Sequence, residues 1–319
     1  MRLVPNTVEK LLLAAPRGYC AGVDRAVQTV ERALQIHGAP VYVRKEIVHN
    51  KHVVGALRER GAIFVDEQTE VPEGAVCVFS AHGVAPSVRE GADKRRLRTI
   101  DATCPLVTKV HREAVRFAND GYTIVLVGHD GHEEVEGTMG EAPDRIVLVQ
   151  SERDVDELEI EDTEHIAYVT QTTLAVDETA SIIERLRERF PRIVGPRTDD
   201  ICYATTNRQA AVKDMAGSCD VLLVIGSRNS SNSQRLVEVA RDCGTEAYLI
   251  ENVGEVREAW LDGARVVGIS SGASAPENLV VELVDFFRER GVSDVSEHEV
   301  RREDVRFMLP KQIREHAAA

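Results

Sequence analysis

The sequence predicts an α/β protein with parallel-rich sheets, and three observations support that prediction. Short apolar runs alternate with amphipathic helical stretches along most of the 319 residues, as in βαβ units. Several helical stretches end in glycine after a charged last turn, which is a usual helix stop signal. Cys20, Cys104 and Cys202 recur in a similar context between a strand-like run and a helical run, so we expect three similar α/β lobes around a shared centre.

Nine short apolar runs are expected to form strands, in chain order. They are LLLAA (11–15), VYV (41–43), AVCVFS (75–80), TIVLVG (123–128), IVLV (146–149), HIAYVTQ (165–171), VLLVIG (221–226), AYLI (247–250) and RVVGIS (265–270). The residues just before Cys104 and Cys202 are also expected to be strand-like. Six stretches with apolar residues three and four apart are expected to be helices. They are 24–38, 50–61, 110–121, 177–190, 207–217 and 232–244.

The domain boundaries are expected to follow the cysteine repeat, because no low-complexity linker marks them. We expect a first lobe at 22–104, a second at 105–198 and a third at 199–319, the last joined by the N-terminal strand at 1–21. The C-terminal tail, about 290–319, includes the charged segment HEVRREDVRFMLP. We expect this tail to pack on the surface or reach back over a neighbouring lobe.

Length and charge restrict the function classes. A chain of 319 residues is longer than most chains that fold around a single hydrophobic core. We therefore expect two or three domains. A net charge of −14 argues against a general binder of nucleic acid or anionic membrane. The longest apolar runs are far shorter than the roughly 20 residues of a membrane helix. The apolar run near the N-terminus is too short for a signal peptide, so a cytoplasmic location is expected.

Three of the six cysteines are candidate metal ligands. Cys20, Cys104 and Cys202 each precede a helix-like run, and a helix N-terminus favours the thiolate. An odd-numbered set of soft ligands suits an iron–sulfur cluster with one iron left open for substrate. Cysteines in a cytoplasmic chain also favour metal or catalytic roles over disulfides. The remaining cysteines are expected to be structural: Cys77, Cys219 and Cys243.

Polar side chains gather just after the expected strands, where ligands bind in parallel α/β sheets. The Ser-Ser-Asn segment between a strand and a helix can present hydroxyls, an amide and helix N–H groups to a phosphate. The sequence contains neither GxxxxGK[ST] nor a GxGxxG after the first strand, so P-loop, nicotinamide and flavin chemistry are not indicated. The set expected to form a diphosphate pocket is His49, His82, His132, Ser230, Asn232 and Ser274.

Glu134 is the candidate proton donor. A carboxyl group in a closed pocket beside a diphosphate has its pKa raised by desolvation and by like charge. It can then be protonated near neutral pH and deliver a proton. The alternative is a solvent-facing acid, because Glu133, Glu134 and Glu136 form one acidic stretch.

Nine segments of the chain resemble a known family when taken together. They are PRGYCAGVDRA, EIVHN, SAHGV, DATCPLVTKVH, GHDGHEEVEGTMG, TQTT, DDICYATTNRQ, GSRNSSNS and SGASAPE. Their order and length resemble the 4-hydroxy-3-methylbut-2-enyl diphosphate reductase (IspH or LytB) family. The resemblance runs from about residue 11 to about 280, and the tail after about 285 carries no recognised motif.

The resemblance implies a pseudo-threefold (trefoil) arrangement of three α/β lobes around a central 4Fe-4S cluster. It implies Cys20, Cys104 and Cys202 as cluster ligands, and Glu134 as the acid, with Thr172 and His132 in the hydrogen-bond network near the substrate hydroxyl. The residues that it implies in substrate binding are His49, His82, His132, Thr172, Ser230, Ser231, Asn232 and Ser274.

The reaction implied by the resemblance removes the allylic hydroxyl group of the substrate as water, using two electrons and two protons. It gives isopentenyl and dimethylallyl diphosphate, the last step of the methylerythritol phosphate route to isoprenoids. Reduced ferredoxin or flavodoxin is the implied electron donor, and the cluster is expected to be oxygen-labile. We expect a monomer.

Three alternatives are kept open, the first of them another cluster enzyme and the other two from different functional classes. A cluster dehydratase of the quinolinate synthase type would condense rather than reduce, and the Ser-Ser-Asn and histidine set favours a diphosphate over its dicarboxylate. A non-enzymatic iron–sulfur sensor of a phosphorylated ligand needs no acid such as Glu134. A zinc hydrolase would use the histidines with Glu134, and zinc without sulfide would support it.

Overall fold

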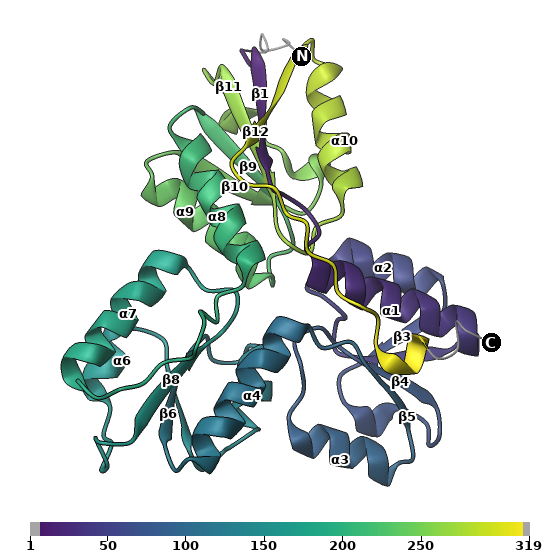
Figure 1. Ribbon diagram of the computed structural model, residues 1–319. Helices are drawn as coiled ribbons and strands as arrows, with labels where there is room; N and C mark the ends of the chain where they lie inside the picture. The colour runs from purple at the N-terminus through teal and green to yellow at the C-terminus, as the bar shows by residue number, and fades with distance from the viewer. Residues whose placement is uncertain (1–6, 315–319) are drawn as a thin grey trace. The chain divides into compact units, whose positions relative to one another are not determined.

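The computed structural model describes residues 7–314, which form three separate parallel sheets of five, four and three strands (Figure 1). The predicted α/β class with parallel sheets is confirmed. The chain divides into two compact units. The first comprises the described residues up to Cys20, together with His49–Lys51 and Tyr203–Val305. The second comprises Ala21–Val48, His52–Cys202 and the described residues from Arg306 onward.

The first unit is a five-stranded sheet with strand order β10-β9-β11-β1-β12 (Figure 1). Its strands are β1 (Lys10–Ala15), β9 (Val221–Ile225), β10 (Glu246–Ile250), β11 (Val266–Ser271) and β12 (Asp294–Glu299). Its helices are α8 (Tyr203–Ala216), α9 (Ser231–Asp242) and α10 (Glu277–Arg288), with the 3-10 turns η2 (Val253–Glu255) and η3 (Glu258–Trp260).

The alternation of side chains along these strands builds two cores. Leu11 and Leu13 of β1 belong to the cluster that includes α10, whereas Leu12 belongs to the cluster that includes α8 and α9. On β9, Leu222 and Leu223 divide between the two clusters in the same way. Both faces of the sheet are therefore covered, which explains why β9 is a continuous apolar run rather than an alternating one.

The second unit contains the other two sheets, with strand orders β3-β2-β4-β5 and β7-β6-β8. The four-stranded sheet is built from β2 (Val41–Arg44), β3 (Ala62–Val65), β4 (Val76–Phe79) and β5 (Arg98–Asp101), with α1 (Ala21–His37), α2 (Lys51–Glu59), η1 (Gln68–Glu70) and α3 (Pro86–Lys94). The three-stranded sheet is built from β6 (Thr123–Val127), β7 (Ile146–Val149) and β8 (Ile166–Thr170), with α4 (Pro105–Asn119), α5 (Glu133–Met139), α6 (Glu152–Glu157) and α7 (Val176–Arg189). The short α11 (Lys311–Arg314) follows near the end of the described chain.

The nine expected strands and six expected helices are all present, with small changes of boundary. The sequence analysis missed β3 and β12, and among the described residues it missed five helices: α3, α5, α6, α10 and α11. The expectation of a strand-like run before Cys202 is wrong, because Asp200 and Ile201 form a bend and Asp199 is irregular. The reason is that Asp200 turns its carboxylate inward and accepts the backbone N–H of Thr170 at 2.9 Å, which ends the extended path.

The first residues of the tail segment belong to a strand that the sequence analysis did not predict. His298 and Glu299 lie in β12, which pairs along the whole of β1. The strand was missed because DVSEHE has only one strongly apolar residue, a composition that suits a sheet edge. Further along, the Met308 carbonyl accepts a hydrogen bond from Arg25 at 2.8 Å in the second unit.

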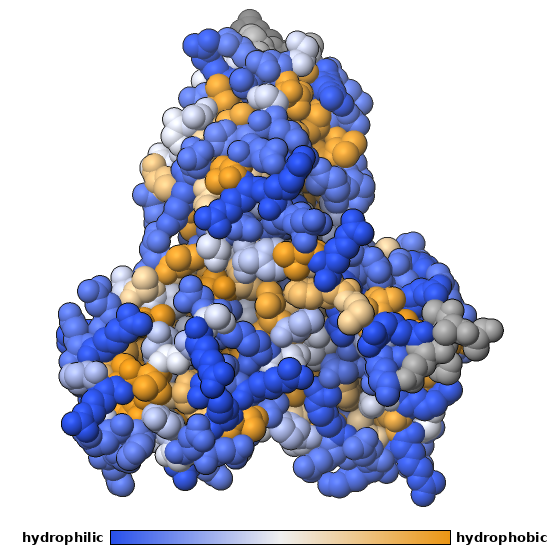
Figure 2. All heavy atoms as spheres, in the orientation of Figure 1, coloured by the Kyte–Doolittle hydropathy of each residue, from blue (hydrophilic) through white to orange (hydrophobic). Residues whose placement is uncertain are grey.

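No helix within residues 7–314 has the length and apolar character needed to cross a membrane. Figure 2 shows that hydrophilic side chains cover most of the viewed face, with smaller apolar patches among them.

Candidate functional site

The candidate proton donor, Glu134, lies in the second unit and has a buried carboxyl group near the start of a helix. Glu134 is the second residue of α5, and its side chain is directed inward, so the residue is only 2% exposed. Thr172, just after β8, donates its backbone N–H to Oε1 of Glu134 at 2.7 Å and its hydroxyl to Oε2 at 2.9 Å. The solvent-facing alternative for Glu134 is therefore wrong.

The environment of Glu134 favours its protonated form. Desolvation by burial raises the pKa of Glu134 from 4.5 to about 7, although the two hydrogen bonds from Thr172 act in the opposite direction. The group therefore changes charge near neutral pH. It can hold a proton and release it there, which is the property that a general acid needs.

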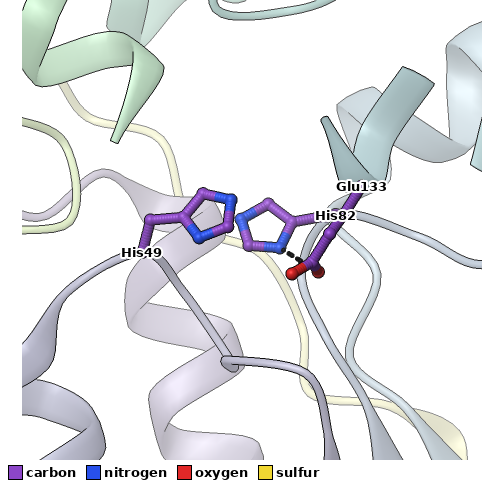
Figure 3. Close-up of side chains that lie close together, drawn as sticks. All are labelled: His49, His82 and Glu133. Atoms are coloured by element: carbon purple, nitrogen blue, oxygen red, sulfur yellow. Dashed lines mark hydrogen bonds and ion pairs between the residues drawn. The ribbon is translucent and has the colours of Figure 1, made fainter. Parts of the chain in front are cut away.

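Two histidines lie beside this acid with defined ring orientations. His132 is the N-cap residue of α5, and its Nδ1 accepts the backbone N–H of Glu134 at 3.1 Å, so the proton of the neutral ring is on Nε2. His82 Nδ1 faces Oε2 of Glu133 at 3.1 Å (Figure 3). The carboxylate favours a proton on Nδ1 of His82. The two rings make an edge contact with centroids 5.8 Å apart.

Glu133 and Asp200 were missed as supporting residues. Glu133 appeared only as part of an acidic stretch, but it orients His82. Asp200 is 4% exposed and accepts from Lys109 Nζ at 2.9 Å as well as from Thr170. Burial raises the pKa of Asp200, and the hydrogen bonds oppose that shift. The signal available in the sequence was the pair of adjacent acids in DDIC, just before Cys202.

Cys104 and Cys202 are anchored through their backbones to this same group of residues. Cys104 is the N-cap residue of α4, and its N–H donates to the Ala81 carbonyl, next to His82, at 2.9 Å. Cys202 donates its N–H to the Thr172 carbonyl at 3.0 Å. Within the second unit, the structure therefore links both thiols to the segments that carry His82 and the partner of Glu134.

Cys20 belongs to the first unit, where it follows β1 and immediately precedes α1. Its N–H donates to the Ala273 carbonyl at 3.1 Å. Ala273 in turn donates its N–H to Oδ1 of Asn232 at 2.8 Å. One short segment after β11 therefore joins the predicted metal ligand Cys20 to the predicted phosphate ligand Asn232.

The other predicted phosphate ligands of the first unit gather at the same end of its sheet. Ser230 is the N-cap residue of α9 and Ser231 is its first residue, so both lie at a helix N-terminus, where the helix dipole favours an anion. The Ser274 hydroxyl donates to the His49 carbonyl at 3.0 Å, and Nδ1 of His49 lies 3.5 Å from Nδ2 of Asn229. The structure brings these polar groups together within one unit.

Two glycines, Gly226 and Gly272, make room for α9 and its N-terminal serines beside the sheet. A Cβ at Gly272 would lie 2.0 Å from Oγ of Ser233, and one at Gly226 would lie 2.2 Å from the same atom. Ser233 is fully buried, and its hydroxyl donates to Oγ of Ser230 at 3.1 Å. The two glycines at the ends of β9 and β11 therefore allow α9 to approach the sheet closely.

The thiol chemistry fits a soft metal group. All six cysteines lie within the described residues and outside any disulfide, and Cys20, Cys104 and Cys202 are half-buried. Burial raises the pKa of Cys77 to about 11 and that of Cys219 to about 12, so these two thiols are poor ligands. Three half-buried thiols with anchored backbones, each just before a helix, suit an iron–sulfur group better than a hard cation.

Comparison with known proteins agrees with this geometry. A family model described as "LytB protein" matches residues 11–288. The chain belongs to the LytB family. The matched range contains every candidate site residue of this LytB chain, and the family expected from the motifs is confirmed. The tail after residue 288 lies outside it.

Curated relatives match the LytB chain over nearly its full length. The 4-hydroxy-3-methylbut-2-enyl diphosphate reductase of Nocardia farcinica is 59% identical over 310 residues, covering 97% of this chain and 92% of the relative. The protein of the same name from Rhodococcus jostii is 60% identical over 307 residues, covering 96% and 91%. The solved structure of the E-1-hydroxy-2-methyl-but-2-enyl-4-diphosphate reductase of Plasmodium falciparum has a TM-score of 0.94 and 37% identity, covering 98% of this chain and 99% of that one.

Proposed function

We propose that this LytB chain reduces (E)-4-hydroxy-3-methylbut-2-enyl diphosphate to isopentenyl and dimethylallyl diphosphate, the last step of the methylerythritol phosphate route to isoprenoids. The observation that carries the proposal is the buried Glu134, held by Thr172 and titrating near pH 7. The relatives named as this reductase supply the substrate class.

A 4Fe-4S cluster held by Cys20, Cys104 and Cys202 is the proposed cofactor. When bound, such a cluster supplies electrons one at a time and an iron with Lewis-acid character. The three thiols are half-buried, and each has an anchored backbone N–H. The electrons would come from reduced ferredoxin or flavodoxin, because the sequence carries no flavin or nicotinamide motif.

Glu134 is the proposed proton donor. Loss of an allylic hydroxyl as water consumes two electrons and two protons, and hydroxide is a poor leaving group unless it is protonated. A protonated Glu134 can deliver that proton, while the Thr172 hydroxyl and His132 complete the hydrogen-bond network. Thr172 donates to the carboxylate form, so it also stabilises Glu134 after the proton has left.

The diphosphate is proposed to bind to the polar groups named above. They are His49, His82, His132, Thr172, Ser230, Ser231, Asn232 and Ser274. Hydroxyls and an amide at a helix N-terminus recognise phosphate oxygens without a Walker loop. An anchored diphosphate would fix the allyl chain, so that its orientation decides which carbon receives the second proton.

The lobe boundaries and the oligomeric state belong to the same proposal. We infer three α/β lobes at 22–104, 105–198 and 199–319, with the strand at 1–21 joining the third, and a monomeric enzyme. The three parallel sheets, each with its own helices, support this division.

Anaerobic turnover tests the proposed function. Protein with measured iron and sulfide would be given the allylic hydroxy-diphosphate and a low-potential chemical reductant, and the products would be identified. Formation of both five-carbon diphosphates is the expected result. Absence of both products with an intact cluster would contradict the proposal.

A further inference from the structure

A buried arginine supports the loop that carries Cys20. Arg208 of α8 is fully buried. Its guanidinium donates twice to the Gly18 carbonyl, from Nη2 at 2.7 Å and from Nε at 3.1 Å, and Nη1 donates to the Ala204 carbonyl at 2.9 Å. Two of its three nitrogens therefore hold one peptide group that lies two residues before Cys20.

The carboxylate that faces this arginine comes from the C-terminal tail. Arg208 Nη1 lies 3.1 Å from Oε1 of Glu303, and the carboxylate is 15% exposed. Asn207 also donates to Oε1 at 3.1 Å. Among the described residues, no other carboxylate bonds to Arg208. A buried guanidinium without solvent contact needs an opposite charge to offset its desolvation, so Glu303 neutralises Arg208 and holds it in place.

The peptide that Arg208 holds has little freedom to move elsewhere. Gly18 has φ +68, a left-handed conformation that glycine adopts readily. A Cβ there would lie 3.4 Å from the Ala275 carbonyl oxygen and from Oε2 of Glu277. Two residues further along, the backbone N–H of Cys20 donates to the Ala273 carbonyl. The loop is therefore fixed between Arg208 on one side and residues 271–275 on the other.

The same segment connects the loop to the predicted phosphate ligands. The Ala273 N–H donates a hydrogen bond to Oδ1 of Asn232, and the Ser274 hydroxyl donates one to the His49 carbonyl. The tail reaches its position because β12 pairs with β1 and the Val300 N–H donates to the Ala15 carbonyl at 3.0 Å. Glu303 then lies three residues beyond that last ladder bond.

We propose that Glu303 is a positioning residue, which acts through Arg208 to hold the Cys20 loop and the adjoining segment 271–275 in the geometry that binds the cofactor and the diphosphate. The proposal rests on the proposed function for the roles of Cys20 and Asn232. It gives the tail, which lies outside the family match at 11–288, a defined part in the site.

The first test measures local structure in metal-free protein and is therefore independent of the proposed activity. Full-length Glu303→Gln and the control Asp304→Asn would be compared with the unsubstituted protein by hydrogen–deuterium exchange. Asp304 is an exposed neighbour in the same tail. We expect exchange at residues 16–20 and 271–275 to rise roughly tenfold in Glu303→Gln, because a charged hydrogen bond is lost, and to stay unchanged in Asp304→Asn. Unchanged exchange in Glu303→Gln, or an equal rise across all strands of the unit, would overturn the proposal.

The second test measures cofactor retention. Proteins loaded anaerobically would be challenged with an iron chelator, and the loss of cluster absorbance would be followed. Glu303→Gln should lose the cluster several-fold faster than Asp304→Asn, and Glu303→Asp, which keeps the charge, should restore most of the retention.

If the unsubstituted protein binds no cluster, the proposed function fails, while the exchange test still decides the role of Glu303. If Glu303→Gln does not fold, Arg208→Lys takes its place in both tests, because a lysine cannot make both bonds to the Gly18 carbonyl. Retention and exchange in Arg208→Lys equal to those of Asp304→Asn would overturn the proposal.

Discussion

Thr172 binds the Glu134 carboxyl group twice, through its backbone N–H at 2.7 Å and through its hydroxyl at 2.9 Å. The same residue accepts the N–H of Cys202 through its carbonyl. One residue therefore links the proposed acid to a proposed cluster ligand. Burial raises the pKa of Glu134 to about 7, and Thr172 limits the rise by stabilising the charged form.

Thr172→Val should remove the hydroxyl bond and keep the backbone bond. The pKa of Glu134 should then rise further, and turnover should fall by roughly tenfold or more, because Glu134 releases its proton less readily. The pH profile of kcat, measured anaerobically, checks both effects. Thr172→Ser keeps the hydroxyl and serves as the control, and a Thr172→Val profile that overlays that of Thr172→Ser would count against the network.

Glu134 should make the stability of the metal-free protein depend on pH. Its folded pKa of about 7 lies above its ordinary value of 4.5, so between these values the folded state binds more protons than the unfolded state. The free energy of unfolding should therefore fall as the pH rises from about 4.5 to about 7, by a total on the order of 3 kcal/mol from this group. Urea unfolding of the native protein and Glu134→Gln across this range checks the prediction. Equal slopes in the two proteins would refute it.

Gly272→Ala should destabilise the first unit and weaken substrate binding. The added Cβ would lie 2.0 Å from Oγ of Ser233, and overpacking of this kind typically costs about 1–3 kcal/mol. The double variant Gly272→Ala, Ser233→Ala removes that atom and should recover much of the stability in a double-mutant cycle. Gly217→Ala is the control, since no atom outside its own vicinity lies within 4 Å of a Cβ there. Additive costs in the cycle would exclude the proposed clash.

Cys104→Ser should prevent retention of an intact cluster, because a hydroxyl is a poor ligand for a soft metal. Iron and acid-labile sulfide per chain, measured after anaerobic loading, check the prediction. Cys243→Ser is the control, since Cys243 is exposed at the end of α9. Native iron and sulfide contents in Cys104→Ser would remove Cys104 from the ligand set.

Elements with a clear apolar pattern could be predicted from the sequence. VLLVI of β9 is buried on both faces and is apolar at every position. DVSEHE of β12 was missed because its pairing with β1 depends on backbone hydrogen bonds rather than on apolar side chains. The short α5 was missed because three of its first four residues are acids, so it lacks an apolar pattern.

The residues of the candidate site could be named from the sequence, but their supporting contacts could not. The burial of Glu134 depends on Thr172, which lies 38 residues further along the chain. The link between Arg208 and Glu303 spans 95 residues. Such contacts follow from the packing of distant segments, so no local pattern predicts them.

The most direct test of the central claim compares product formation by Glu134→Gln and Glu136→Gln, both loaded anaerobically with cluster. Glu136 is an exposed acid on the same helix, so its substitution controls for the change of charge at α5. We predict that Glu134→Gln keeps its cluster and binds the allylic diphosphate but forms products roughly 10²–10⁴-fold more slowly, whereas Glu136→Gln matches the unsubstituted protein. Formation of both five-carbon diphosphates by Glu134→Gln at the rate of Glu136→Gln would contradict the account.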